Sequence, residues 1–173
     1  TKGGVEGEAK GKGGIEKLLN TGEENGTKWI PAEVDVSIRP GWFYHASEDK
    51  KVKTPEQLFD IYLTSVGRGS NLLLNIPPDR RGLLNEIDVQ SLQGFKKLID
   101  QSFAKNLAMN AKVDASSFRG NATQFNPKNC VDGNKETYWA MDDDIIAANI
   151  EIDLPKDSEV NFVVLQEYIK LGQ

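Results

Sequence analysis

Apolar and polar side chains alternate from residue 29 to residue 38, in the segment WIPAEVDVSI. Five apolar residues share one side of it: Ile30, Ala32, Val34, Val36 and Ile38. A period of two places successive side chains on opposite faces and predicts a β-strand. The second face of this strand carries two carboxylates, Glu33 and Asp35.

A helix and a second strand are predicted next. Thr54, Pro55 and Gln57 form a helix start with a capping box, and Gly67 stands where the helix would stop. The short apolar run 71–76, NLLLNI, is typical of a parallel strand covered on both faces. Strand, helix and strand together predict a βαβ unit.

A second helix is expected from a cap at Asn85 to about Phe103, with four apolar residues facing inward: Leu92, Phe95, Leu98 and Ile99. Beyond residue 105, turn residues separate short apolar stretches, and Ile150, Ile152 and Leu154 alternate with acidic residues. This pattern is typical of a β-sandwich. The expected organisation is therefore α/β in residues 1–104, with a glycine-rich loop over 1–28, and all-β in residues 105–173.

Composition limits the function. With 38% hydrophobic and 27% charged residues, the chain has the make-up of a folded globular protein. A net charge of −5 argues against nucleic acid as a partner, and no apolar run is long enough to span a membrane. Only one cysteine, Cys130, and one histidine, His45, are present, which excludes multi-histidine metal sites and leaves any catalysis to carboxylates.

The most informative stretch follows the first predicted strand, where Arg39, Pro40 and Gly41 lead into the run Trp42 to His45. Sugar rings stack their C–H faces on indole rings, and their hydroxyls bond to charged side chains, so this loop resembles a carbohydrate subsite. The alternative is that Trp42, Phe43 and Tyr44 close the mouth of a barrel by packing together, without contacting a ligand.

Two long segments, WIPAEVDVSIRPGWFYH and SVGRGSNLLLNIPPDRRGLL, resemble the last part of the catalytic barrel of glycoside hydrolase family 29, the retaining α-L-fucosidases. The resemblance runs from about Trp29 to Phe103. It implies that the α/β part is the C-terminal portion of a (β/α)8-like barrel. The form SIRPGWFYH is similar to the branch of the family that prefers α-1,3- and α-1,4-linked fucose.

The resemblance also implies site residues. A retaining glycosidase needs two carboxyl groups about 5–5.5 Å apart. The position of Glu33 in the PAE motif matches the acid/base, whereas the nucleophile would precede Thr1. Asp35 is a second candidate, with a structural hydrogen-bonding role as the alternative.

Substrate contacts are expected from Trp29, Trp42, Arg39 and His45. For Arg39 the expected partner is a sugar hydroxyl or another carboxylate, and for His45 the alternative is an ordinary surface or core position. Arg80 and Arg81 either receive an extended glycan or form a solvated charged loop.

Residues 106–173 resemble the opening strands of a discoidin-type (coagulation factor 5/8 C-like) β-sandwich, on the segments NLAMNAKVDASS and NCVDGNKETYWA. In relatives of this module, the residues matching Asp132 and Thr137 ligate a structural Ca²⁺. An Asx-turn closed by Asp132 is the metal-free alternative. No other cofactor is expected.

The two resemblances imply a hydrolase, a retaining exo-α-L-fucosidase acting on fucosylated oligosaccharides or glycoconjugates in an extracellular, periplasmic or lysosomal setting. Because the first residue is Thr1 and a complete barrel takes about 250 residues, we expect a piece of a longer protein that is inactive alone. The competing hypothesis is a carbohydrate-binding or adhesion protein with a non-catalytic barrel.

Overall fold

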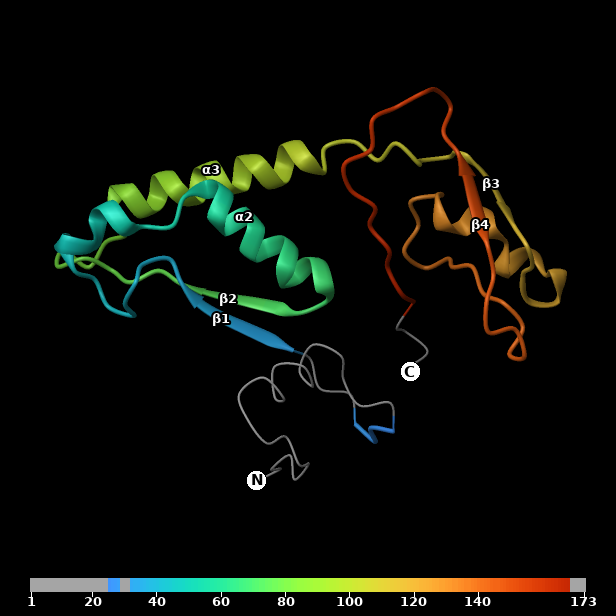
Figure 1. Ribbon diagram of the computed structural model, residues 1–173, viewed down its shortest axis with the longest axis horizontal. Coiled ribbons are helices and arrows are strands. Elements are labelled where there is room, and N and C mark those ends of the chain that lie inside the picture. The colour runs from blue at the N-terminus through green and yellow to red at the C-terminus, as the bar shows by residue number, and fades with distance from the viewer. Residues whose placement is uncertain (1–24, 29–31, 169–173) are drawn as a thin grey trace. The chain divides into compact units, whose positions relative to one another are not determined.

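The structure is a computed structural model that describes residues 25–28 and 32–168. The chain divides into two compact units, Thr1–Ile99 and Asp100–Gln173 (Figure 1). Trp29 lies outside the described residues, so its expected sugar contact has no structural counterpart here.

The first unit contains the expected βαβ arrangement. Strand β1 (Glu33–Ser37) is followed by helix α2 (Pro55–Thr64) and strand β2 (Asn71–Asn75). The strands pair in parallel over their whole length. Their carboxyl ends therefore meet at one edge, where Ser37 lies opposite Asn75. Figure 1 shows α2 and the following helix on the same side of this strand pair.

Helix α2 starts as predicted and ends earlier than predicted. The Thr54 hydroxyl accepts from the Gln57 N–H, and the Gln57 side chain accepts from the Thr54 N–H, which completes a capping box. The helix stops at Thr64, whose hydroxyl donates back to the carbonyl of Asp60. Instead of Gly67, Gly69 takes the left-handed conformation after a 3-10 turn, with φ of 83°. Glycine tolerates this φ without strain.

Helix α3 (Glu86–Ser102) packs against α2. The Asn85 side chain caps it, as predicted, by accepting from the backbone N–H of Ile87 at 3.0 Å. The rings of Tyr62 on α2 and Phe95 on α3 meet edge to face, with centroids 6.1 Å apart. Phe95, one of the residues expected to face inward on this second helix, therefore contacts the first helix.

The centre of the described part of this unit is formed by Ile38 and Leu58, which are 0% and 1% exposed. Strand β2 differs from the expectation of cover on both faces, because Leu73 is 54% exposed. Leu72 and Leu74 are half-buried. The helices seen here cover one side of the pair, so alternate residues of β2 remain open.

The second unit contains the antiparallel pair of β3 (Lys112–Ala115) and β4 (Ile150–Asp153). The alternating segment beginning at Ile150 is thus a strand, as predicted. Across the described residues this pair is the only sheet of the unit, and the expected β-sandwich is not established. Residues 161–168 have no regular secondary structure.

Short 3-10 turns complete the described elements: Ala46–Lys51 and Val66–Arg68 in the first unit, and Arg119–Asn121, Thr123–Phe125 and Pro127–Cys130 in the second. Within the described ranges, no helix has the length and apolar character needed to cross a membrane.

Candidate functional site at the carboxyl edge of β1 and β2

The loop after β1 is fixed at the carboxyl edge by side chains from both strands. The Asn75 amide nitrogen donates to the Ser37 hydroxyl at 3.1 Å and to the Trp42 carbonyl at 3.0 Å. The Ser37 hydroxyl in turn donates to the Gly41 carbonyl at 2.7 Å. These contacts make Asn75 a hydrogen-bonding residue at the end of β2. They hold the backbone of the aromatic loop over the strand ends.

Arg39 is the buried cation of this edge, with 1% of the residue exposed. Its Nε donates to Asp88 at 2.9 Å, and its Nη1 donates to Asp49 at 2.9 Å. Nη1 also reaches the His45 carbonyl at 3.4 Å, and the guanidinium lies 4.7 Å from the centre of the Tyr44 ring. Arg39 therefore joins the end of β1, the loop that follows and the first turn of α3.

These contacts correct the expectation of a sugar contact for Arg39. Of the two partners expected from the sequence, the structure shows the second, another carboxylate. Burial alone would lower the pKa of the Arg39 guanidinium, but its hydrogen bonds to Asp88 and Asp49 outweigh that effect and raise it. A guanidinium with no exposed surface and two carboxylate partners supports the loop. Its buried Nη2 has no hydrogen-bond partner among the described residues.

A groove of about 500 Å³ opens beside this support. One wall is the segment Tyr44–Ser47, which follows β1, and the other is the turn Asp79–Arg81, which follows β2. The volume lies within the usual range of roughly 300–1,000 Å³ for small-molecule sites. His45, an expected substrate contact, is thus placed in a groove at the carboxyl edge, where barrel enzymes bind their substrates.

The turn at the second wall is internally braced. Arg81 donates from Nε and Nη2 to one Asp79 oxygen, at 2.9 and 2.6 Å, and from Nη2 to Glu86 at 2.8 Å. The other Asp79 oxygen accepts from the backbone N–H of Arg81. The hydrogen bonds from Arg81 lower the pKa of the Asp79 carboxyl. Asp79 therefore stays ionised and is unsuited to act as a general acid at neutral pH.

Trp42 and Phe43 leave large apolar surfaces open, with 51% and 78% of each residue exposed. Because Asn75 holds the Trp42 carbonyl, the backbone of this residue is fixed while its ring remains accessible. An exposed indole on a fixed backbone is suited to stacking on a sugar face.

Glu33 and Asp35 lie outside the groove. Both are exposed on one face of β1, and neither lines the groove. Glu33 is the first residue of the strand, so at roughly 3.3 Å per residue it lies about 13 Å from Ser37. Asp35 is in mid-strand, opposite Leu73. The structure does not bring Glu33 to the edge that carries Trp42 and His45.

The second unit shows the hydrogen bonds of an Asx-turn at the suggested calcium position. Asp132 accepts from the Asn134 N–H at 2.8 Å and from the Thr137 hydroxyl at 2.7 Å. These bonds lower the pKa of Asp132, the Thr137 bond contributing most. No group of three or more His, Cys, Asp or Glu residues that would hold a metal is found in the described part of the chain. Both Asp132 oxygens accept from protein donors, as in the Asx-turn alternative, and calcium binding at this turn stays a prediction.

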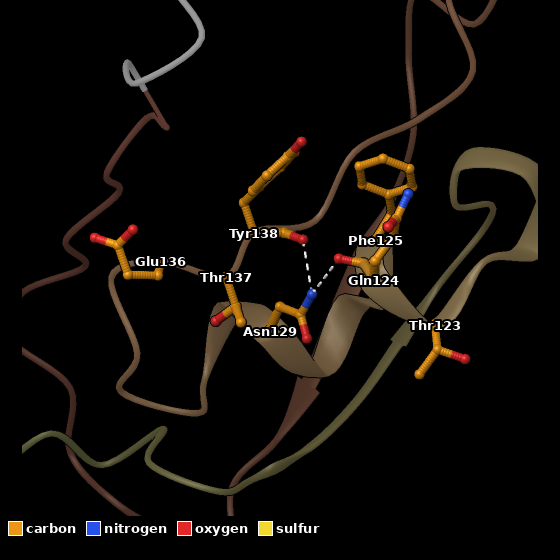
Figure 2. A pocket seen from close by; sticks show the side chains of 7 residues that line it. All are labelled: Thr123, Gln124, Phe125, Asn129, Glu136, Thr137 and Tyr138. Carbon is orange, nitrogen blue, oxygen red and sulfur yellow. Dashed lines mark hydrogen bonds between the residues drawn. The ribbon is translucent and has the colours of Figure 1, made fainter.

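A shallow hollow of about 400 Å³ lies next to this turn (Figure 2). Figure 2 shows the Asn129 amide between Gln124 and Tyr138, where its nitrogen donates to both backbone carbonyls at 2.8 Å. The rings of Phe125 and Tyr138, which also line this hollow, have centroids 5.5 Å apart. The Asn129 amide nitrogen thus links the backbone at Gln124 to the backbone at Tyr138.

The comparisons with known proteins agree with this geometry. The sequence profile of the family described as Alpha-L-fucosidase matches residues 8–102, slightly more than half of the chain. The chain belongs to the alpha-L-fucosidase family. The family resemblance seen in the sequence is thereby confirmed for the first unit, whereas a discoidin-like second unit is not shown.

Individual relatives give the same result. Alpha-L-fucosidase 1 of Arabidopsis thaliana is 41% identical over 88% of the chain. A crystal structure of a candidate alpha-L-fucosidase from Bacteroides thetaiotaomicron matches 81% of the chain with 50% identity and a TM-score of 0.73. A Ruminococcus gnavus GH29 fucosidase in complex with fucose matches 79% with 38% identity and a TM-score of 0.73. The chain spans 30%, 30% and 27% of these three proteins.

The sequence did not reveal the carboxylates that hold Arg39 or the second wall of the groove. Asp88 and Asp49, which hold Arg39, carry no local motif, because they lie 49 and 10 residues from it along the chain. The second wall of the groove was considered only as a solvated loop or a glycan contact. The Pro-Pro pair before Asp79 was the available signal, since it ends β2 and starts a turn at the same edge.

Proposed function

We propose that the protein carrying this chain is a retaining exo-α-L-fucosidase, a hydrolase that removes terminal α-L-fucosyl groups from oligosaccharides or glycoconjugates. The observation that carries the proposal is the family match over residues 8–102. The groove supports it, because it lies at the strand edge where barrel enzymes bind substrate. Since the chain spans about three tenths of its relatives, we expect the isolated chain to be inactive.

This chain contributes substrate-contacting residues in the proposal. The exposed Trp42 ring provides a flat apolar surface for a sugar face, and His45 provides a ring with hydrogen-bonding nitrogens in the groove. Arg39 and Asn75 hold the backbone of both residues through their carbonyls. Sugar recognition therefore depends on side chains that are presented by a braced loop.

The catalytic carboxylates require a separate test. A retaining mechanism needs a nucleophile and an acid/base about 5–5.5 Å apart, and the acid needs a raised pKa. Asp79 is the carboxylate of the groove, and its lowered pKa and its bonds to Arg81 oppose that role. Glu33 as acid/base, and Asp35 as its alternative, stay predictions from the family motif. Their exposure at a distance from the groove does not support either role.

Three finer points belong to the proposal. The likeness of the SIRPGWFYH segment to one branch of the family favours α-1,3- or α-1,4-linked fucose as the substrate. The second unit is proposed as the start of a discoidin-like sandwich, for which the antiparallel pair β3–β4 is a suitable beginning. An extracellular, periplasmic or lysosomal setting follows from the family resemblance and awaits a localisation experiment.

The direct test uses the full-length protein. Release of 4-nitrophenol from 4-nitrophenyl α-L-fucoside, and of fucose from α-1,3- and α-1,4-fucosylated trisaccharides, is expected to exceed the buffer rate by orders of magnitude. Fucose binding without hydrolysis of any of these compounds would favour the carbohydrate-binding alternative.

The role of Glu33 is tested by Glu33→Ala, with Glu56→Ala on an exposed helix position as the matched control. An acid/base loss lowers kcat strongly for poor leaving groups and is partly restored by azide. Activity equal to the control would remove Glu33 from the mechanism.

A further inference from the structure

Two arginines line the groove, Arg80 and Arg81, and a third, Arg39, is buried beside it. Arg39 pairs with two carboxylates, and Arg81 is held by Asp79 and Glu86. Arg80 has no ion-pair partner among the described residues. Its guanidinium is therefore the cation of this groove that remains available to a ligand.

The surroundings of Arg80 are suited to a polar sugar ligand. The Tyr44 ring and the His45 imidazole lie on the facing wall of the same groove, and Ser47 adds a hydroxyl. The carboxylate nearest in sequence, Asp79, has both oxygens engaged by Arg81 and is 6% exposed at its side chain. Asp79 is thus a poor competitor for Arg80.

The chemistry of a guanidinium defines the ligand. Its planar N–H fork pairs with the oxygens of a carboxylate or a sulfate ester through two parallel charge-assisted hydrogen bonds. A neutral sugar hydroxyl offers a single oxygen and gains less from such a group. A free arginine in a sugar-sized groove therefore discriminates between anionic and neutral glycans.

We propose that Arg80 binds an anionic group, a carboxylate or a sulfate ester, that the leaving oligosaccharide carries on the galactose branch next to the cleaved fucose. This inference rests on the proposed fucosidase function and specifies the substrate class for the same site. It makes Arg80 a specificity-determining residue and assigns it no part in bond cleavage.

The experiment measures kcat/KM of the full-length protein on three α-1,3-fucosylated oligosaccharides that differ in one group on the neighbouring galactose: none, a 3-linked sialic acid, or a 3-sulfate. The expected result is about a tenfold preference for at least one anionic substrate over the neutral one, as for a charge-assisted contact. The preference should fall as salt is raised from low to 0.5 M, because screening weakens an exposed ion pair. The two anionic arms distinguish a carboxylate from a sulfate ester as the ligand.

Two variants complete the test. Arg80→Ala is expected to lower the anionic-to-neutral ratio of kcat/KM about tenfold, and Arg80→Lys to retain part of it. Arg68→Ala removes the same charge beyond the other end of β2 and is expected to keep the wild-type ratio. A ratio near one in the wild type, or equal ratios in the Arg80→Ala and Arg68→Ala proteins, overturns the inference. Absence of activity on all three substrates refutes the proposed function instead.

Discussion

Replacing Asp88 with Asn tests the buried support of the groove. The side chains of Arg39 and Asp88 are both 0% exposed, and their Nε–Oδ2 distance is 2.9 Å. Asn keeps the shape of Asp but leaves the buried guanidinium short of one negative charge. Breaking such a buried pair from one side costs about 3–5 kcal/mol, because the remaining charge is desolvated without compensation. Asp49 is 28% exposed at its side chain, so Asp49→Asn should cost less, about 1 kcal/mol.

The assay is urea denaturation of the wild-type and variant proteins, followed by circular dichroism. Asp88→Asn should lower the free energy of unfolding at least twice as much as Asp49→Asn. The double variant Arg39→Met/Asp88→Leu removes both charges and should recover more than half of the loss. A cost below about 1 kcal/mol for Asp88→Asn, or equal costs for the two single variants, would refute the reasoning.

Three further predictions concern packing and ionisation. A Cβ at Gly94 would lie 2.5 Å from the Pro55 Cγ. Gly94→Ala should therefore destabilise the protein by about 1–2 kcal/mol in urea denaturation, although Ala has the better helix propensity. A gain in stability would contradict this prediction. The pKa of Asp132 is lowered in the folded protein, so its contribution to stability is present above the unfolded-state pKa and is lost as pH falls through the folded-state pKa. Thr137→Val should raise the pKa of Asp132, as measured by NMR titration. An unchanged pKa would contradict the role of the Thr137 hydroxyl. Desolvation, together with the negative charge of Asp132, raises the pKa of the Cys130 thiol. A disulfide reagent at pH 8 should therefore label Cys130 more slowly than a free cysteine peptide, and Asp132→Asn should speed the labelling. Equal labelling rates for Cys130 and the peptide would contradict the raised pKa.

The sequence by itself determined the local elements. The capping box of Thr54 and Gln57 and the cap at Asn85 join groups two or three residues apart, so their hydrogen bonds form within the local chain. Alternation predicted β1 and β4 because strand period is a property of consecutive residues. The end of α2 was less predictable, since the hydroxyl of Thr64 competed with a glycine signal three residues later.

The family motif includes the loop after β1, which carries two of the expected substrate contacts: Trp42 at the carboxyl edge and His45 in the groove. The motif did not show that Glu33 begins β1 and so lies away from the carboxyl edge. Periodicity reports the face on which a side chain lies, whereas its distance from a site depends on where the strand begins and ends.

Only the tertiary structure decided how the edge is built. Parallel pairing of β1 and β2 brings two distant loops together, so Asn75 reaches the Trp42 carbonyl and Arg39 reaches Asp88 across 33 and 49 residues of chain. Contacts of this length follow from packing, and no local pattern encodes them. For the same reason the sequence showed three arginines of equal charge at this edge, while the fold distinguished two that brace the site from Arg80, which faces the groove without an ion-pair partner among the described residues.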